Sequence, residues 1–302
     1  MFDSIRRGFG FLGQALDMAR KDGDLLKPSV YGMGVGFVVS IIGAIPIIIA
    51  ALLVGDTDFG NVALGVLGAI LIFVQYAVAY IFSGMTAYLV YGYLTEGDAR
   101  MEKAWEIVRR DWWDILSLAG ASTLVKIVEN FARGRRGRRN PLGEIIANII
   151  NTVWTTATYF ILPAMVIEDL NLANAVKRAT EIIRKNLLLV AVTEIGVSGV
   201  VGFIGGILGF IAVLIGVGIF FAFAATANQT ESVWPFVIGG GLAVLVSGSL
   251  LAVITALSSY VTTAYHTCMF LWARTAEDAV AHGQSAQAVP APAPLAAVLN
   301  PA

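Results

Sequence analysis

The chain contains four uninterrupted apolar runs, at residues 29–54, 62–94, 187–227 and 233–272. A helix needs roughly 20 apolar residues to cross a hydrocarbon core of about 30 Å, and each run exceeds that length. Only 14% of the residues are charged, against about 25% in soluble domains. Polar side chains therefore cannot cover the apolar surface, and the surrounding medium is expected to be lipid. These features predict an all-α polytopic membrane protein.

Two less apolar stretches are further candidate spans. With the four long runs they predict about six transmembrane helices, arranged in three hairpins. Residues 114–130 carry Lys126 and Glu129 near their end, and residues 142–167 follow a basic loop, 133–139, with five arginines. The last two long apolar runs have no polar turn in their middles, so each is predicted to be one long or kinked helix. From residue 276 the chain is rich in Ala, Pro and Gln, a composition that predicts a disordered tail over 276–302.

Residues 2–21 are amphipathic rather than uniformly hydrophobic. Apolar side chains recur at steps of three and four from Phe2 to Ala19, with charged and polar residues between them. This period builds one apolar helical face. A basic amphipathic helix beside a membrane span is typical of a helix that lies in the membrane interface. Residues 99–113 and 170–186 have the same character.

These three amphipathic stretches contain an internal repeat at Ala15–Asp22, Ala104–Asp111 and Ala179–Asn186. Each copy has an Ala, an acid two positions later, a basic pair and then Asp or Asn. The acid lies three and four residues before the basic pair, the spacing of a helical ion pair. The basic pair is favoured at a helix C-terminus, and the final Asp or Asn can cap the next helix.

The repeat divides a single transmembrane domain, residues 1–275, into units of about 1–94, 95–167 and 168–275. Each unit is a basic amphipathic helix followed by a hydrophobic hairpin. Under the positive-inside rule the amphipathic helices and both termini are expected in the cytoplasm. The cations expected to contact anionic lipid headgroups are the three basic pairs, Arg20, Lys21, Arg109, Arg110, Arg184 and Lys185.

The arginine loop 133–139 conflicts with this orientation, because six crossings place it outside. The central hairpin is also the least apolar. Two alternatives therefore remain: six full crossings, or a re-entrant central hairpin whose basic loop stays near cytoplasmic headgroups.

Two segments carry a resemblance to a known family. The first is Phe2 to Pro28, with Arg6-Arg7, Arg20-Lys21-Asp22 and Leu25-Leu26-Lys27-Pro28; the second is Trp154, Thr158-Tyr159-Phe160, Pro163, Glu168, Ala175, Arg178 and Arg184-Lys185. Over roughly residues 1–275 the chain resembles an uncharacterised bacterial family of six-span membrane proteins, annotated only as a domain of unknown function. It is also distantly similar to the membrane-anchor domain of some glycerophosphodiester phosphodiesterases. The resemblance implies six spans in a bacterial inner membrane and no known chemistry.

Ionisable and amide side chains inside the spans raise a functional hypothesis, because such groups are rare in a bilayer. The candidate intramembrane polar cluster is Lys126, Glu129, Glu144, Asn148, Asn151 and Glu194. In an antiparallel hairpin that turns near residue 136, Lys126 is expected to pair with Glu144 or Asn148. Such a pair is either a structural seam or part of a substrate or ion path.

Other polar and small residues in the spans predict helix packing. Gln75 is expected to form an interhelical hydrogen bond. Thr255, Ser259, Thr262 and His266 recur at steps of four, three and four and predict a small polar face. Glycine pairs at four-residue spacing let helices approach closely; these are Gly32 and Gly36, Gly202 and Gly206, and Gly205 and Gly209.

The sequence contains no phosphate-binding loop, no paired metal ligands and no nucleophile elbow. We therefore expect no enzyme activity, no catalytic residues, no cofactor and no metal. Cys268 is the only cysteine and is expected to pack in the core. The basic loop beside a bilayer favours anionic lipid over nucleic acid.

Two functions remain: a scaffold or accessory subunit of a membrane complex, and a transporter or lipid-handling protein. The expected partners are the lipid bilayer, anionic headgroups, and a second copy of the chain or another membrane protein.

Overall fold

The computed structural model describes residues 2–54, 57–133, 141–185, 187–230, 233–285 and 289–299, with side chains described except at 2–7, 187–198, 227–230 and 297–299. Every regular element in these ranges is helical. The elements are α1 (Phe2–Lys21), the 3-10 turn η1 (Gly23–Leu25), α2 (Lys27–Val54), α3 (Asp58–Glu96), α4 (Met101–Arg110), α5 (Trp112–Arg133), α6 (Pro141–Glu168), α7 (Leu172–Lys185), α8 (Leu187–Thr230), α9 (Trp234–Ala281) and α10 (Ala293–Leu299).

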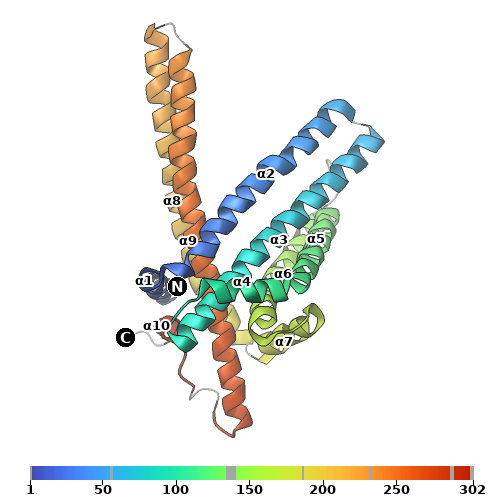
Figure 1. The fold of residues 1–302 in the computed structure, drawn as a ribbon, viewed down its shortest axis with the longest axis vertical. Helices are drawn as coiled ribbons and strands as arrows, with labels where there is room; N and C mark the ends of the chain where they lie inside the picture. Colours follow the sequence, from blue (N-terminus) through green and yellow to red (C-terminus); the bar gives the residue numbers. More distant parts are fainter. Residues whose placement is uncertain are drawn as a thin grey trace.

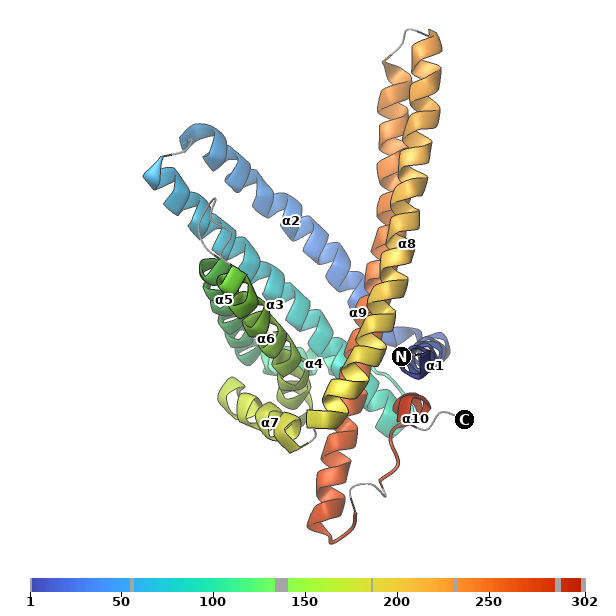
Figure 2. The ribbon, with the colours of Figure 1, turned by 180° about the vertical axis from the view of Figure 1, so that it is seen from behind.

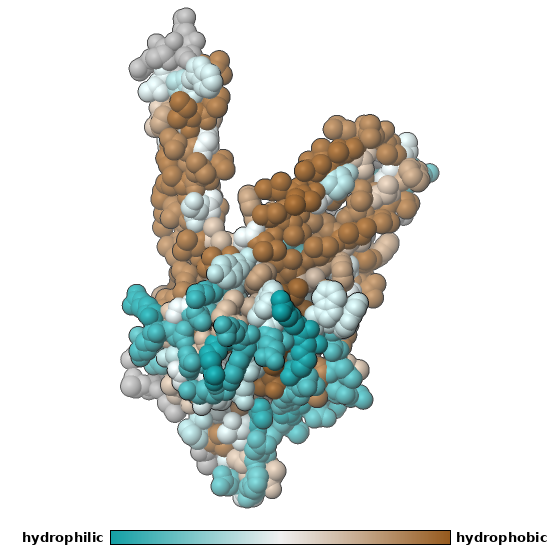
Figure 3. All heavy atoms as spheres, viewed as in Figure 1, coloured by the Kyte–Doolittle hydropathy of each residue, from teal (hydrophilic) through white to brown (hydrophobic). Residues whose placement is uncertain are grey.

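Six of these helices are long and apolar enough to cross a membrane. They form three antiparallel hairpins, α2–α3, α5–α6 and α8–α9 (Figure 1). The short amphipathic helices α1, α4 and α7 gather at the opposite end from the hairpin tips (Figures 1 and 2). We call that end the base. Apolar side chains cover the hairpins and polar ones cover the base (Figure 3). The predicted helical membrane fold with six candidate spans is confirmed.

The alanine at the first position of the repeat is buried in each copy. Ala15, Ala104 and Ala179 are 0%, 0% and 1% exposed. A methyl group at this position lets each amphipathic helix lie closely against its neighbours, α4 on α3 and α7 on α6, whereas α1 packs on α8. The amphipathic helices are therefore packed parts of the fold.

Two hairpins end in the same way at the base. The last residue of α3, Glu96, is followed by Gly97 at φ 76°, and the last residue of α6, Glu168, is followed by Asp169 at φ 55°. This left-handed conformation stops a helix. It is natural for glycine, and aspartate adopts it more readily than most residues because its short side chain can hydrogen-bond locally.

The glutamates at these two helix ends reach the next amphipathic helix. Lys103 Nζ lies 3.3 Å from Glu96 Oε2, and Arg178 Nε lies 3.0 Å from Glu168 Oε2. Lys103 and Arg178 both stand one position before the repeated alanine. The ion pair is thus shared by the second and third copies of the repeat, whereas the first copy has Gln14 at this position.

Glycines bring the paired helices close together. A Cβ at Gly32 would lie 2.8 Å from Phe82 Cβ, and one at Gly205 would lie 3.3 Å from Ser258 Oγ. Gln75 Nε2 donates to Gly36 O at 3.0 Å, which confirms the predicted interhelical hydrogen bond. By contrast, a Cβ at Gly202 or Gly206 would meet open space, so that predicted packing pair is wrong.

The hairpins diverge from the base toward their tips, α8–α9 in one direction and α2–α3 in the other (Figures 1 and 2). At 44 and 48 residues, α8 and α9 are each longer than a crossing, as predicted for single long helices. None of the most apolar window of α2 is buried. Apolar side chains along α2 and α8 therefore face the surrounding medium, which fits hydrocarbon.

The chain after residue 276 differs from the predicted disordered tail. Helix α9 continues to Ala281, and α10 packs against α1 with Leu295 fully buried. Trp272 Nε1 also donates to Val289 O at 3.3 Å. The prediction rested on the average composition of the tail. A few apolar residues around Leu295 are enough for a short helix to pack against α1.

Candidate functional site

The predicted partner of Lys126 is wrong. Lys126 Nζ lies 3.0 Å from Glu129 Oε2, on its own helix α5, and does not pair with Glu144 or Asn148. The other oxygen of Glu129 lies 2.6 Å from Arg133 Nη2. The Glu129 side chain is only 2% exposed. A buried carboxylate requires such pairing, and residues three and four positions away on one helix supply it most directly.

The network reaches α6 through Arg133. Its Nη2 donates to Asn148 Oδ1 at 3.0 Å, so the expected polar link between α5 and α6 exists with a different cation. Glu144 and Asn151 lie exposed on α6 and are not in this network. The side chain of Glu194 lies outside the described residues. Three of the six predicted cluster residues thus lie in one network: Arg133 joins Glu129 to Asn148, and Lys126 pairs with Glu129.

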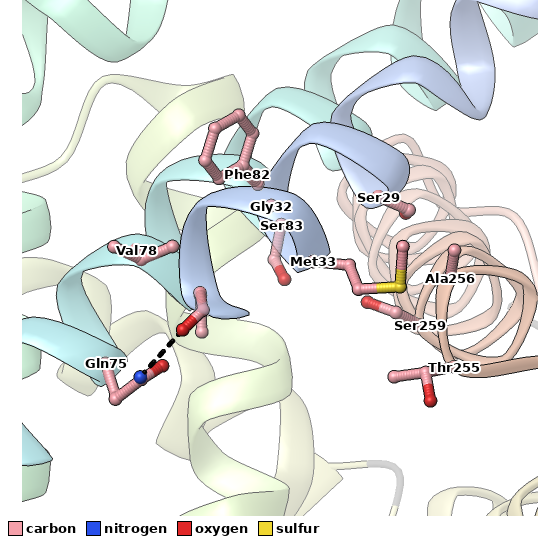
Figure 4. Close-up of a pocket in the computed structure, with 12 residues that line it drawn as sticks. Ser29, Gly32, Met33, Gln75, Val78, Phe82, Ser83, Thr255, Ala256 and Ser259 are labelled. Atoms are coloured by element: carbon pink, nitrogen blue, oxygen red, sulfur yellow. Dashed lines mark hydrogen bonds between the residues drawn. The ribbon is translucent and has the colours of Figure 1, made fainter. Parts of the chain in front are cut away.

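A cavity of about 140 Å³ lies where α2, α3 and α9 meet, and we call it the middle cavity. Its polar lining comes from all three helices: Ser29, Gln75, Ser83, Thr255 and Ser259. The side chains of Ser83, Met33 and Ser259 lie around the same space (Figure 4). Thr255 and Ser259 belong to the polar face predicted for the last span, so that face lines a cavity.

Two hydroxyls in the middle cavity make no hydrogen bond with any described residue. Ser83 is half-buried, and Ser259 is exposed. By comparison, the exposed Thr255 donates to Leu251 O at 2.8 Å. Both hydroxyls are therefore available to hydrogen-bond water or a polar ligand group in the cavity.

A second cavity, of about 70 Å³, lies nearer the base between α3, α6 and α9, and we call it the base cavity. Tyr80, Ser83, Thr158, Tyr159 and His266 supply its polar groups. The rings of Tyr159 and His266 stack with centroids 3.7 Å apart. The structure thus places His266 in a cavity wall, while its Nδ1 contacts the carbonyl of its own helix at 2.7 Å.

A third cavity, of about 520 Å³, lies nearer the tips between α2, α3 and α5, and we call it the tip cavity. Ser40, Gln75, Tyr76 and Lys126 line it. Gln75 also donates to Ser40 Oγ at 2.6 Å. The predicted cluster residue Lys126 therefore faces a wide opening as well as the buried Glu129.

Neighbouring cavities share lining residues on helix α3. Ser83 lines both the base and middle cavities, and Gln75 and Ala79 line both the middle and tip cavities. From Ala87 to Leu71 the lining spans 16 residues, about 24 Å at 1.5 Å per residue. A hydrocarbon core is about 30 Å thick. The cavity lining therefore follows α3 through most of the thickness of a bilayer, and its polar α3 residues, Gln75 to Ser83, occupy about 12 Å of that length.

Sequence reasoning missed this face of α3, although a signal was present. Gln75, Ala79, Ser83 and Ala87 recur at steps of four and are all small or polar. Residues at this spacing share one side of a helix. Within an apolar run of more than 30 residues, such a stripe separates a polar face from lipid-facing ones.

The predicted headgroup cations, Arg20, Lys21, Arg109, Arg110, Arg184 and Lys185, are all exposed at the base. Arg110 Nε contacts the buried Asp111 at 2.6 Å and Asp169 at 3.1 Å. Burial raises the pKa of Asp111 above its ordinary value of 3.8, although Arg110 opposes that shift. Asp111 thus binds Arg110 instead of capping the next helix, so the predicted cap is wrong in this copy of the repeat. In the first copy the Asp22 side chain does cap η1.

A second ion network at the base was not predicted. Arg178 contacts Glu168 on α6 and Glu277 on α9, the latter at 2.5 Å, and Lys185 also contacts Glu277. Burial opposes the charge of Arg178, but the two carboxylates outweigh it and raise the pKa. The network ties α7 to the ends of two hairpins, and one of its acids lies in the segment expected to be disordered.

No protein-family model matches the chain, and no curated protein matches it either. The resemblance to a six-span family therefore stays a prediction. Among the described residues, the polar groups of the cavities are hydroxyls, amides, one imidazole and one ammonium. Such a set can solvate a polar group inside a membrane.

Proposed function

We propose that the chain is a non-enzymatic lipid-handling membrane protein that carries the polar part of an amphiphile along α3. The observation that carries this proposal is the series of cavities that share Ser83, Gln75 and Ala79. A polar group entering hydrocarbon loses its hydration at a cost of several kcal/mol. Hydroxyl and amide groups spaced along the helix replace water contacts at each step.

An amphiphile fits better than a water-soluble solute. The tip cavity is the widest of the three, and lipid-exposed helices border it. Acyl chains can therefore stay in the bilayer while the polar part occupies the cavities. The base cavity, at about 70 Å³, holds only a few water molecules. Passage of a headgroup thus requires the hairpins to separate, and their tips already diverge (Figure 1).

The proposal places the base at the cytoplasmic face of a bacterial inner membrane, with both termini inside. The six exposed cations of the basic pairs support this orientation through the positive-inside rule. In this position they contact anionic headgroups, and each contributes about 1 kcal/mol of attraction. The central hairpin crosses fully in this account, since the 22 residues of α5 span about 33 Å.

Lipid flux in liposomes tests the function. Purified chain is reconstituted with fluorescent-headgroup phospholipid in both leaflets, and a membrane-impermeant reductant then bleaches the outer leaflet. Active protein gives bleaching beyond half of the signal. We expect the double variant Ser83→Val, Gln75→Leu to lower the rate at least fivefold. Ser249→Ala is the control, because Ser249 lies on α9 outside the cavities and bonds Leu245 O of its own helix.

A bleached fraction that stays at half for the wild-type chain, in vesicles shown to contain folded protein, contradicts lipid transport. Equal rates for wild type and the double variant contradict the role of α3.

A scaffold or accessory subunit is the second candidate, favoured by the exposure of α2. Its most apolar window contains no buried residue, and Phe37 and Ile42 are 67% and 63% exposed. A partner helix or a second copy of the chain could cover that side. A photo-crosslinking residue at position 37 tests this in cells. Discrete protein adducts support a scaffold, and adducts with lipid alone contradict it.

A further inference from the structure

A fourth cavity, an apolar groove, lies beside the base between α2, α3 and α4. Its volume is about 580 Å³, and the side chains that line it include Tyr31, Val35, Phe82, Met85, Met101 and Trp105. Ligand sites typically measure about 300–1,000 Å³. The lining is almost wholly apolar, so a hydrated solute has no hydrogen-bond partners there. A hydrocarbon chain is the chemistry that this groove fits.

One end of the groove carries a cation. Met101, Trp105 and Arg109 follow one another at steps of four on α4, so they share one helix face. The Arg109 guanidinium carbon lies 5.6 Å from the centroid of the Trp105 ring. This stacking holds the exposed arginine beside the groove. Tryptophan and arginine at the edge of an apolar region are typical of the headgroup level of a membrane.

We propose that this groove binds one anionic phospholipid of the leaflet at the base. One acyl chain lies along Tyr31, Met85 and Trp105, and the headgroup phosphate pairs with Arg109. An apolar protein segment would fill the groove without using the arginine, whereas a phospholipid uses both parts. The groove shares only Phe82 with the middle cavity and no lining residue with the base or tip cavity. Lipid binding in the groove does not depend on lipid transport.

The glycine in the groove wall allows a precise test. Gly34 lines the groove, and a Cβ built on it meets no heavy atom within 4 Å. Gly34→Leu should therefore fill the groove without a clash, and leucine favours a helix over glycine by roughly 0.5–1 kcal/mol. Gly65→Leu is the matched control, because Gly65 lies on α3 with equally open space and does not line the groove.

Native mass spectrometry of the full chain in mild detergent measures the binding. Phosphatidylglycerol and phosphatidylcholine with identical chains are added, and bound lipid is counted for each. We expect the wild type and Gly65→Leu to retain one phosphatidylglycerol in preference to phosphatidylcholine. Gly34→Leu should lose at least fivefold in the occupancy of both lipids. Arg109→Gln should keep phosphatidylcholine binding and lose the preference for phosphatidylglycerol.

Unchanged phosphatidylglycerol occupancy in Gly34→Leu overturns the proposed site. A full preference for phosphatidylglycerol in Arg109→Gln overturns the role of the arginine. Lipid flux is measured separately, so a chain that binds as expected but transports nothing supports this site and contradicts the transport proposal alone.

Discussion

Asp22 Oδ2 accepts a hydrogen bond from the backbone N–H of Ala99 at 2.8 Å, across 77 residues of sequence. The other oxygen of Asp22 caps η1 by accepting from Asp24 N at 3.0 Å. One carboxylate therefore links the end of α1 and the start of the first hairpin to the segment that follows α3. Ala99 is only 2% exposed, so water cannot easily replace this acceptor.

Replacing Asp22 should destabilise the base. Asp22→Ala removes a cap worth about 0.5–2 kcal/mol and leaves a buried N–H unpaired at a cost of about 1–3 kcal/mol. We expect a loss on the order of 3 kcal/mol, seen as a clear fall in Tm in detergent. Asp17→Asn, at an exposed ion pair with Lys21, should cost under about 1 kcal/mol. Equal effects of the two changes would refute the double role of Asp22.

Asp111 should make stability depend on pH. Its pKa in the folded chain is raised above 3.8 by burial, so the folded state binds the proton more tightly than the unfolded state. This contribution is complete below the unfolded pKa and is lost as pH rises through the folded pKa. The Tm of wild type minus that of Asp111→Asn should therefore fall as pH rises across this window. A difference that stays constant, or that increases with pH, contradicts the shift.

Substituting the two cations that pair with Glu129 should distinguish a structural role of this network from a role in transport. Lys126 and Arg133 both pair with Glu129, but only Lys126 lines the tip cavity. Each of Lys126→Met and Arg133→Met leaves the other cation in place, so both proteins should assemble. We expect lipid flux to fall severalfold in Lys126→Met and to stay near wild type in Arg133→Met. Equal flux in the two variants would mean that the network is only a structural seam.

The position of the basic loop decides the number of crossings. A cysteine at residue 136, in a Cys268→Ala background, can be labelled with an impermeant thiol reagent in intact cells and in inverted vesicles. The six-crossing account predicts labelling from the outer side only. Labelling from the cytoplasmic side only would establish a re-entrant central hairpin.

The helices could be predicted because their signals are local. The 3.6-residue period at Phe2 to Ala19 and the length of the apolar runs each determine one element without reference to the rest of the fold. The burial of Ala15, Ala104 and Ala179 also agrees with the repeat in the sequence.

The polar contacts were harder to predict because they depend on distances between helices. Lys126 was assigned to α6 from the register of an ideal hairpin, whereas Glu129 offered a closer partner on its own helix. The spacing of Ser83 with Gln75 marks a face of α3, but the place of Ser83 between two cavities arises only where α2, α6 and α9 pack around α3. Glu277 could not be found because the composition of its surroundings suggested disorder.

The central claim is that a face of small and polar side chains on α3 lines cavities within the membrane. Single cysteines at residues 75, 79, 83 and 87, in the Cys268→Ala background, test it with a small charged thiol reagent in liposomes. We predict reaction at these positions, and none at position 77, which is buried, or position 70, which faces lipid. Failure of all four cavity positions to react, or equal reaction at 70 and 77, would contradict the account.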